Sequence, residues 1–326
     1  MKKNLAILMT TVLAAASLAA CGSSSTPATT TAAATTAAET TAAAEETTAA
    51  ETTAAEAPEQ GAAEGSGETV AVPTDFTTVT EGKLTIATSP DFAPYEFYHI
   101  NNGTPELSGF DVALGKRIAD DLGLEVQFVP MDFDGILMEL QSGNVDLGIS
   151  GFSPSPERAE TFDFSDLYYM GGQSFVIRKA DHDKYTDYAA FDGLPVGAQN
   201  GSIQMDLAKE NTPNANIIGL AKVTDIVSEL VSGKLEGGFI ETAVAEQYIK
   251  NYPELEIAWD VPYDTQGSAI ALKKGSDLLP AVNAVINNAL SDGSMDQYIT
   301  EAQELASDED NVYEGQLDAD GNVASN

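Results

Sequence analysis

A cation and several small hydroxyl side chains stand close together in segment 143–166. An apolar run there ends in a Ser/Gly corner, 150–153, which is followed by Ser155, Pro156 and Arg158. Ser155 suits the N-cap of a helix, and Pro156 suits the first helical position, where a backbone N–H is not needed. Arg158 would lie in the first turn, where a guanidinium beside free N–H groups can hold a carboxylate or phosphate at two points. The alternative is a surface arginine in an ordinary strand-to-helix turn.

Other kinds of chemistry have little support in the residue types. His99 and His182 are the only two imidazoles, and neither lies in segment 143–166. The sequence has no Gly-rich phosphate loop with Lys and Ser or Thr, so it does not predict ATP hydrolysis by this chain. The single cysteine, Cys21, excludes an internal disulfide framework and a cysteine-based zinc cluster. We therefore expect no catalytic residue, no metal and no cofactor.

Short β-rich runs alternate with helical patterns between residues 84 and 306, which is typical of an α/β fold. The clearest helix is expected at 110–122, where Leu114, Ile118 and Leu122 share one stripe and Gly123 provides the stop. Strands are expected at 84–88, 125–129, 145–149, 173–178, 194–198, 216–220 and 238–240. Further helices are expected at 136–140, 201–209, 225–231, 243–250, 277–290 and 295–306.

Three segments with polar or aromatic side chains follow predicted strands, namely 89–95, 131–134 and 150–158. Ligands in open α/β sheets lie beyond the carboxyl ends of the strands. We therefore expect these three segments to converge on one cleft.

Residues 1–20 are typical of a lipoprotein signal peptide. A basic start and an apolar core lead to the sequence Leu-Ala-Ala-Cys at 18–21, which resembles a lipoprotein signal-peptidase box. Cleavage before Cys21 would leave an N-terminal cysteine that carries lipid and anchors the protein to the outer face of the cell membrane. The alternative is an ordinary secretory signal that leaves Cys21 as a free thiol.

The two ends of the chain beyond the signal are poor in large apolar side chains. Residues 21–82, mostly Thr, Ala, Ser and Glu, predict a lipidated cysteine followed by a disordered tether. Residues 307–326 are acidic and polar, and we expect a disordered tail. The formal net charge of −36 disfavours nucleic acid and anionic lipid headgroups as partners and indicates solubility outside the cell.

Several motifs in the same order resemble the extracellular solute-binding proteins that serve polar amino-acid ABC transporters. The similarity runs from about residue 83 to 306 and is carried by segments 88–97, 109–112, 131–135, 143–166 and 162–166. The resemblance implies a two-lobed periplasmic-binding-protein-like (type II) fold, with two sheets flanked by helices and a hinge of two chain crossings. Lobe one would be residues 83–172 plus 266–306, and lobe two residues 173–265.

The resemblance also implies how an amino acid is held. Arg158 would bind the ligand carboxylate with the help of Gly151 and Ser153. Glu241 would bind the ammonium from the second lobe, at a position where the family usually has an aspartate.

Further contacts follow from the same resemblance. Phe92 and Phe133 would sandwich the ligand, and loop 200–204 would face it with Ile203 in place of the usual threonine. Ser89 stands where relatives that bind basic amino acids often carry an aspartate, which favours a neutral or polar ligand. The expected ligand-binding residues are Ser89, Phe92, Phe133, Ser150, Gly151, Phe152, Ser153, Arg158, Asn200, Gly201, Ser202, Ile203, Gln204 and Glu241.

The function that the resemblance implies is capture of a free amino acid by hinge closure and delivery to an ABC importer. The expected partners are the amino acid, an ABC permease and its ATPase. The protein is expected to be a monomer that meets the membrane only through its lipid. The alternatives are a cyclohexadienyl dehydratase-like enzyme and the sensor module of a receptor on the same fold.

Overall fold

The computed structural model of the protein describes residues 69–263, 267–308 and 312–313. The predicted signal peptide (1–20), the lipidation of Cys21, the tether over residues 22–68 and the tail residues 309–311 and 314–326 lie outside the described residues. These expectations stay predictions.

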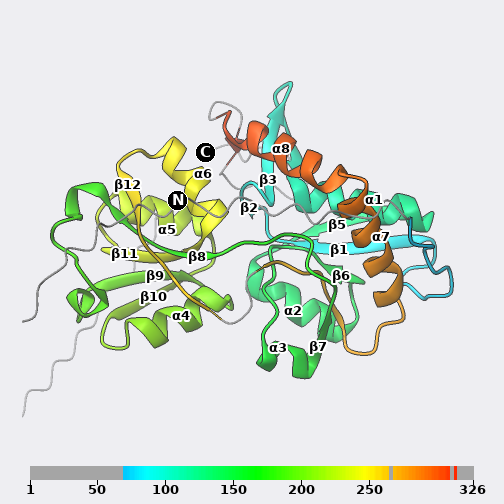
Figure 1. Cartoon of the computed structure of the whole chain (residues 1–326), viewed down its shortest axis with the longest axis horizontal. Helices are drawn as coiled ribbons and strands as arrows, with labels where there is room; N and C mark the ends of the chain where they lie inside the picture. The colour runs from blue at the N-terminus through cyan, green and yellow to red at the C-terminus, as the bar shows by residue number, and fades with distance from the viewer. Residues whose placement is uncertain (1–68, 264–266, 309–311, 314–326) are drawn as a thin grey trace, which may run out of the picture. The chain divides into compact units, whose positions relative to one another are not determined.

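The first sheet has strands in the order β5-β1-β6-β13-β7. Strand β1 pairs in parallel with β5 and β6, whereas β13 is antiparallel to β6 and β7. Figure 1 shows α1 and α2 on opposite faces of this sheet. We call the first sheet and the helices packed on it lobe one. Its elements are β1 (Lys83–Thr88), α1 (Phe110–Leu122), β5 (Glu125–Pro130), α2 (Phe133–Ser142), β6 (Leu147–Gly148), α3 (Pro156–Thr161), β7 (Phe162–Phe164), β13 (Ala271–Lys273), α7 (Leu279–Ser291) and α8 (Ser294–Ala306).

The second sheet has strands in the order β10-β9-β11-β8-β12. Strand β9 is parallel to β10 and β11, whereas β8 is antiparallel to β11 and β12. We call this sheet and its helices lobe two. Its elements are β8 (Gln173–Arg178), η1 (Lys179–Asp181), η2 (Tyr188–Phe191), β9 (Pro195–Gln199), α4 (Ile203–Asn211), β10 (Asn216–Leu220), α5 (Val223–Val231), β11 (Gly237–Glu241), α6 (Thr242–Asn251) and β12 (Leu255–Asp260).

A small sheet, which we count with lobe one, and two chain crossings complete the described fold. The small sheet holds β2 (Asp91–Phe92), β3 (Glu96–Asn101), β4 (Thr104–Ser108) and β14 (Val312–Tyr313). The crossings between the lobes run antiparallel at one bridge, where the Ser268 N–H donates to the Tyr169 carbonyl at 2.8 Å. The predicted α/β class is thus confirmed.

The apolar stripe that the sequence predicts for α1 is the face that this helix buries. Leu114 and Ile118 of α1 are fully buried, and the helix ends at Gly123 in the left-handed conformation. Lobe two has an aromatic core in which the fully buried Phe175 ring contacts Phe191, Phe239 and Trp259.

The predicted tether needs a correction at its end. Residues 69–82 are attached to the folded part of the chain: Val72 and Phe76 pack against a buried core cluster to which both lobes contribute, and Asn288 of lobe one exchanges two hydrogen bonds with the backbone of Val70. The N–H of Val79 also donates to Asp146 at 2.6 Å. Scattered apolar residues within a polar stretch supply this attachment, because each can bury its side chain on the lobe.

The predicted disordered tail needs a correction as well. Val312 and Tyr313 form β14, which pairs with Tyr98 and His99 of β3. Val312 also packs against a small apolar cluster that includes Phe97 and Ala306. One apolar side chain and an open strand edge are enough to hold this part of the acidic tail.

Replacing Phe175 by alanine should lower the free energy of unfolding by about 3–5 kcal/mol, because it removes a fully buried ring and leaves a cavity. Met138→Ala is the matched control: its side chain is 61% exposed, and the change should stay within about 0.5 kcal/mol. Urea unfolding followed by circular dichroism measures both. Equal unfolding midpoints for the two variants would contradict this account of the core.

Candidate functional site

The Ser/Gly corner and the helix that follows it have the predicted local structure. The corner begins just after β6, and α3 begins at Pro156 with Ser155 as its N-cap. The Ser155 hydroxyl accepts a hydrogen bond from the N–H of Arg158 at 3.2 Å. This bond fixes the first turn of α3 and directs Arg158 from lobe one toward lobe two.

The guanidinium of Arg158 joins the two lobes. Its Nη1 donates to the Ser153 carbonyl at 3.0 Å, and its Nη2 donates to the Gly201 carbonyl of lobe two at 2.8 Å. Burial lowers the pKa of Arg158, whereas the nearby carboxylates of Asp206 and Glu157 raise it. An arginine stays charged under such opposing influences, so the cleft holds a fixed positive charge.

A small cavity lies beside this guanidinium, and both lobes contribute to it. It is lined by Phe92, Phe133, Gly151, Ser153, Arg158, Gln199, Ile203 and Gln204. All of these except Gln199 were predicted from the sequence to contact a ligand. Three segments that follow strands of lobe one therefore meet here, as the α/β pattern predicts.

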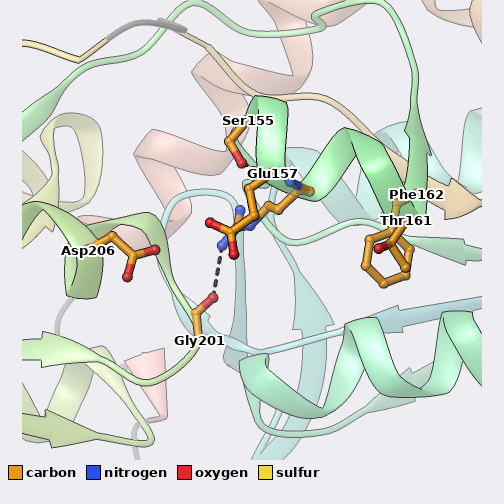
Figure 2. A pocket seen from close by; sticks show the side chains of 7 residues that line it. Ser155, Glu157, Thr161, Phe162, Gly201 and Asp206 are labelled. Atoms are coloured by element: carbon orange, nitrogen blue, oxygen red, sulfur yellow. Dashed lines mark hydrogen bonds between the residues drawn. The ribbon is translucent and has the colours of Figure 1, made fainter.

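A second, more open pocket adjoins the cavity at Arg158. Its lining is Ser155, Glu157, Arg158, Thr161, Phe162, Gly201 and Asp206. Figure 2 shows the carboxylates of Glu157 and Asp206 facing the same space, and its dashed line ends at the Gly201 carbonyl, which accepts from Arg158. These two carboxylates form an acidic rim beside one half-buried guanidinium, and Asp206 also pairs with Lys209 at 3.1 Å.

Glu241 occupies a different place from the one that the resemblance implies. It is only 3% exposed, and its Oε2 accepts a hydrogen bond from the N–H of Val244 at 3.0 Å, which caps α6. Its Oε1 is buried without a hydrogen-bond partner among the residues that the structure describes. Glu241 does not line the cavity. Contact with a ligand ammonium stays a prediction for this residue.

Tyr95 lies between Glu241 and the cavity. Its ring is 5.3 Å from that of Phe92, centroid to centroid. Burial raises the pKa of Glu241 to about 7, and the Tyr95 hydroxyl acts in the opposite direction. The ammonium group of a ligand could reach Glu241 only if Tyr95 moved aside or the ligand extended past the Tyr95 ring.

The other predicted site residues have structural roles around the cavity. The Ser89 hydroxyl donates to Asp91 at 2.6 Å, and the Ser150 hydroxyl donates to Glu96. Ser202 caps α4 by accepting from the N–H of Met205 at 3.2 Å. Phe152 is fully buried against Phe133, with the ring centroids 4.7 Å apart, and the Asn200 side chain packs over Gly219. The structure thus does not bring these five to the cavity lining.

Two buried acids that the sequence argument left without a role accept hydrogen bonds from the Ser/Gly corner (150–153). Asp111 accepts hydrogen bonds from the Gly151 N–H and the Tyr168 hydroxyl, both at 2.9 Å. Burial raises the pKa of Glu96 and that of Asp111, the latter to about 6, and the two carboxyl groups interact with each other. The signal for them was present in segments 95–97 and 109–112, whose acids follow aromatic residues.

Comparison with known proteins gives consistent matches. The sequence profile of the bacterial extracellular solute-binding proteins, family 3, matches residues 84–301. The arginine-binding extracellular protein ArtP of Bacillus subtilis is 33% identical over 219 residues, which cover 66% of this chain and 84% of that protein.

Solved structures of similar proteins agree with this family assignment. The substrate-binding protein AbpA of a Streptococcus pneumoniae amino-acid ABC transporter, bound to L-arginine, has a TM-score of 0.68 at 35% identity over 70% of this chain and 98% of that one. The ancestral amino-acid-binding protein AncCDT-1, a precursor of cyclohexadienyl dehydratase, has a TM-score of 0.61 at 30% identity over 68% of this chain and 95% of that one. The predicted two-lobed, type II periplasmic-binding-protein-like fold is confirmed.

Two further searches concern only the described residues. Within 69–263, 267–308 and 312–313, no helix is long and apolar enough to cross a membrane. In the same part of the chain, no three His, Cys, Asp or Glu side chains are grouped so that they could hold a metal ion.

The raised pKa of Glu241 predicts how stability depends on pH. Between pH 4.5 and about 7 the folded state keeps the proton of Glu241 while the unfolded state loses it. The free energy of unfolding should therefore fall as pH rises through this window, by about 3 kcal/mol from this group. Below pH 4.5 both states hold the proton, and the contribution is fully present.

The test compares Glu241→Gln with the wild type in urea unfolding at several pH values between 4.5 and 8. Glutamine keeps an oxygen for the Val244 N–H and cannot titrate, so the profile of the variant should be flatter. Glu210→Gln, at an exposed position of α4, is the control and should leave the slope unchanged. Parallel profiles for Glu241→Gln and the wild type would show that Glu241 does not titrate in this range.

Proposed function

Because the chain belongs to the bacterial extracellular solute-binding proteins of family 3, we propose that its ligand is an amino acid with a cationic side chain, with L-arginine as the first candidate. The protein is an extracytoplasmic binding component of an amino-acid ABC importer. The single observation that carries the ligand proposal is the charge pattern of the cleft: the carboxylates of Glu157 and Asp206 line the same pocket as the guanidinium of Arg158.

Arg158 supplies the contact for the ligand carboxylate. Its Nη2 donates to the Gly201 carbonyl of lobe two, which a carboxylate can replace with a stronger, charge-assisted bond. The hydroxyl of Ser153 lies on the same cavity and already accepts from Tyr263 at 3.0 Å, so its own proton is available to a ligand. The Gly151 N–H, which the family resemblance also implicates, donates to Asp111.

The acidic residues around the cleft favour a ligand whose side chain is cationic. Glu157 and Asp206 line the outer pocket, and Glu241 lies buried behind Tyr95. A negative rim raises the local concentration of cationic ligands and disfavours acidic ones. The aromatic rings of Phe92 and Phe133 can also contact a cation through their faces.

The sequence argument from Ser89 pointed instead to a neutral or polar ligand. The Ser89 hydroxyl is bonded to Asp91 and does not line the cavity. The residue type at this position therefore says little about the ligand side chain. The names of the similar proteins ArtP and AbpA, which include arginine as the bound or recognised amino acid, support the cationic class.

Capture and delivery follow from the two-lobed arrangement. The bond from Arg158 to the Gly201 carbonyl joins the lobes at the cleft, so in this proposal the lobes separate before a ligand enters and close around it afterwards. In this proposal a monomer delivers the amino acid to a permease and its ATPase. The lipid on Cys21 supplies the membrane attachment.

One observation favours a second function. Glu241 combines burial with a pKa of about 7, which suits a general acid or base. AncCDT-1 is itself an amino-acid-binding protein, and its description as a precursor of cyclohexadienyl dehydratase names the reaction to test. Turnover of prephenate or arogenate by the purified protein would support this function. Our proposal expects binding without turnover.

A thermal-shift screen of the twenty amino acids tests the ligand class. L-Arginine and L-lysine should raise the melting temperature most, because only their side chains complement the acidic rim. L-Glutamine serves as the neutral control of similar length, and L-glutamate as the acidic one. A larger shift with glutamine than with arginine would reject the cationic proposal while leaving amino-acid binding intact.

Arg158→Ala should weaken binding of the best ligand by at least about 30-fold, or about 2 kcal/mol, because the ligand carboxylate loses its cationic partner. Arg158→Lys should recover only part of this loss, since an ammonium cannot form the two-pronged contact. Arg117→Ala is the matched control, because this arginine pairs with Asp121 and Asp292 on lobe one and does not line the cavity. Calorimetry measures all three, and an unchanged affinity in Arg158→Ala would remove this residue from the site.

A further inference from the structure

Asp91 is a buried carboxylate of lobe one whose hydrogen bonds lead to lobe two. It is 7% exposed and lies in β2, next to the cavity but outside its lining. Its Oδ1 accepts from the Ser89 hydroxyl at 2.6 Å. Its Oδ2 accepts from the backbone N–H of Val223 at 2.6 Å and from Nε2 of Gln199 at 3.2 Å.

Both partners of Oδ2 belong to lobe two. Val223 is the first residue of α5, where backbone N–H groups lack helical partners, and Gln199 is the last residue of β9. The Tyr248 hydroxyl of α6 adds a long bond of 3.4 Å to the carbonyl of Asp91. Three elements of lobe two thus meet at one residue of lobe one.

We propose that Asp91 fastens the closed arrangement of the two lobes without touching the ligand, and that it thereby sets the affinity for the amino acid. The part of this proposal that concerns affinity rests on the proposed function, whereas the part that concerns the lobes does not. The geometry carries both parts. The bonds to Val223 and Gln199 join the two lobes, so a separation that moves α5 and β9 away from β2 breaks them, and Asp91 does not line the cavity.

A contact that exists only in the closed state changes the population of that state. If a ligand binds tightly only to closed lobes, its apparent affinity scales with the fraction of protein that closes readily. Asp91 therefore acts as a positioning residue: it contributes to affinity through the lobe equilibrium.

The charge of Asp91 makes this equilibrium depend on pH. Burial raises the pKa of Asp91 to about 6, Asp132 adds to the rise, and Lys222 opposes it. The charge of Asp91 also raises the pKa of Glu96 in β3, so these two carboxyl groups repel each other. Separation of the lobes would return the carboxyl toward its ordinary pKa, so the closed state binds the proton more tightly. Closure should therefore become more favourable as pH falls from about 7 toward 5.

Two variants separate the hydrogen bonds of Asp91 from its charge. Asp91→Ala removes all of the side-chain bonds. Asp91→Asn can keep all of them, with its oxygen facing Val223 and Gln199 and its amide N–H₂ donating to the Ser89 oxygen, and it cannot titrate. We expect Asp91→Ala to weaken L-arginine binding at least about tenfold at pH 7. Asp91→Asn should bind at least as tightly as the wild type and show a flatter pH profile between 5 and 7.

A second pair of variants tests the partner in lobe two without altering Asp91. Val223→Pro removes the N–H that Asp91 accepts. Proline is tolerated at the first position of a helix, and Lys222 before it has the extended conformation that proline requires. Val223→Ala keeps the N–H while it trims the same buried side chain. Proline should therefore weaken binding and loosen closure relative to alanine.

The measurements are calorimetry with L-arginine at pH 5, 6, 7 and 8 and the distance between the lobes in ligand-free protein. Fluorescence energy transfer between dyes on Glu125→Cys in lobe one and Glu210→Cys in lobe two, in a chain carrying Cys21→Ser, reports that distance. We expect a longer mean distance for Asp91→Ala and Val223→Pro, and little change for Val223→Ala.

The outcomes are distinguishable. Wild-type distances and affinities in both Asp91→Ala and Val223→Pro would overturn the proposal. If Asp91→Ala fails to fold, the Val223 pair alone decides between the same two results. If no amino acid binds to any variant but the distances change as expected, the proposed function fails and the role of Asp91 in closure stands.

Discussion

The positive charge of Arg158 is the feature around which the cleft is arranged. A guanidinium taken partly out of water needs acceptors on every side, and those acceptors come from Ser153 of lobe one and Gly201 of lobe two. The cation therefore draws two separate lobes to one point before any ligand is considered. An amino-acid carboxylate enters this arrangement as a better acceptor than a neutral carbonyl.

Three buried carboxyl groups of lobe one hold the parts that surround the cleft. Asp111 accepts from the backbone of the Ser/Gly corner, Glu96 accepts from the Ser150 hydroxyl of the same corner, and Asp91 accepts from lobe two. Burial raises the pKa of each of these groups, because it removes water from the charged form. The site therefore depends on residues that do not line it as well as on those that do.

The sequence predicted those structural features that depend on residues close together in the chain. The stripe and terminal glycine of α1, and the Ser155 cap of α3, depend on residues within one or two helical turns, and the structure has them where the sequence places them. The hairpin of β3 and β4 was missed although Asn102 and Gly103, both at positive φ, carry a recognisable turn signal.

Distant contacts were beyond the sequence argument. Asp91 and Val223 are separated by 132 positions, and no local pattern links them. The sequence also indicated which residues of lobe one gather at the cavity, because parallel strands bring their carboxyl ends together. How deeply Glu241 is buried, and that Tyr95 lies in front of it, depend on the packing of two lobes against each other.

The attachment of residues 69–82 has a mechanical consequence. This stretch is bonded to lobe one at Asn288, Asp277 and Asp146, and the described hydrogen bonds from it reach no residue of lobe two. A pull that is transmitted through these hydrogen bonds acts on lobe one. An attachment to a surface through the N-terminal part of the chain would therefore load lobe one first and need not oppose movement of lobe two.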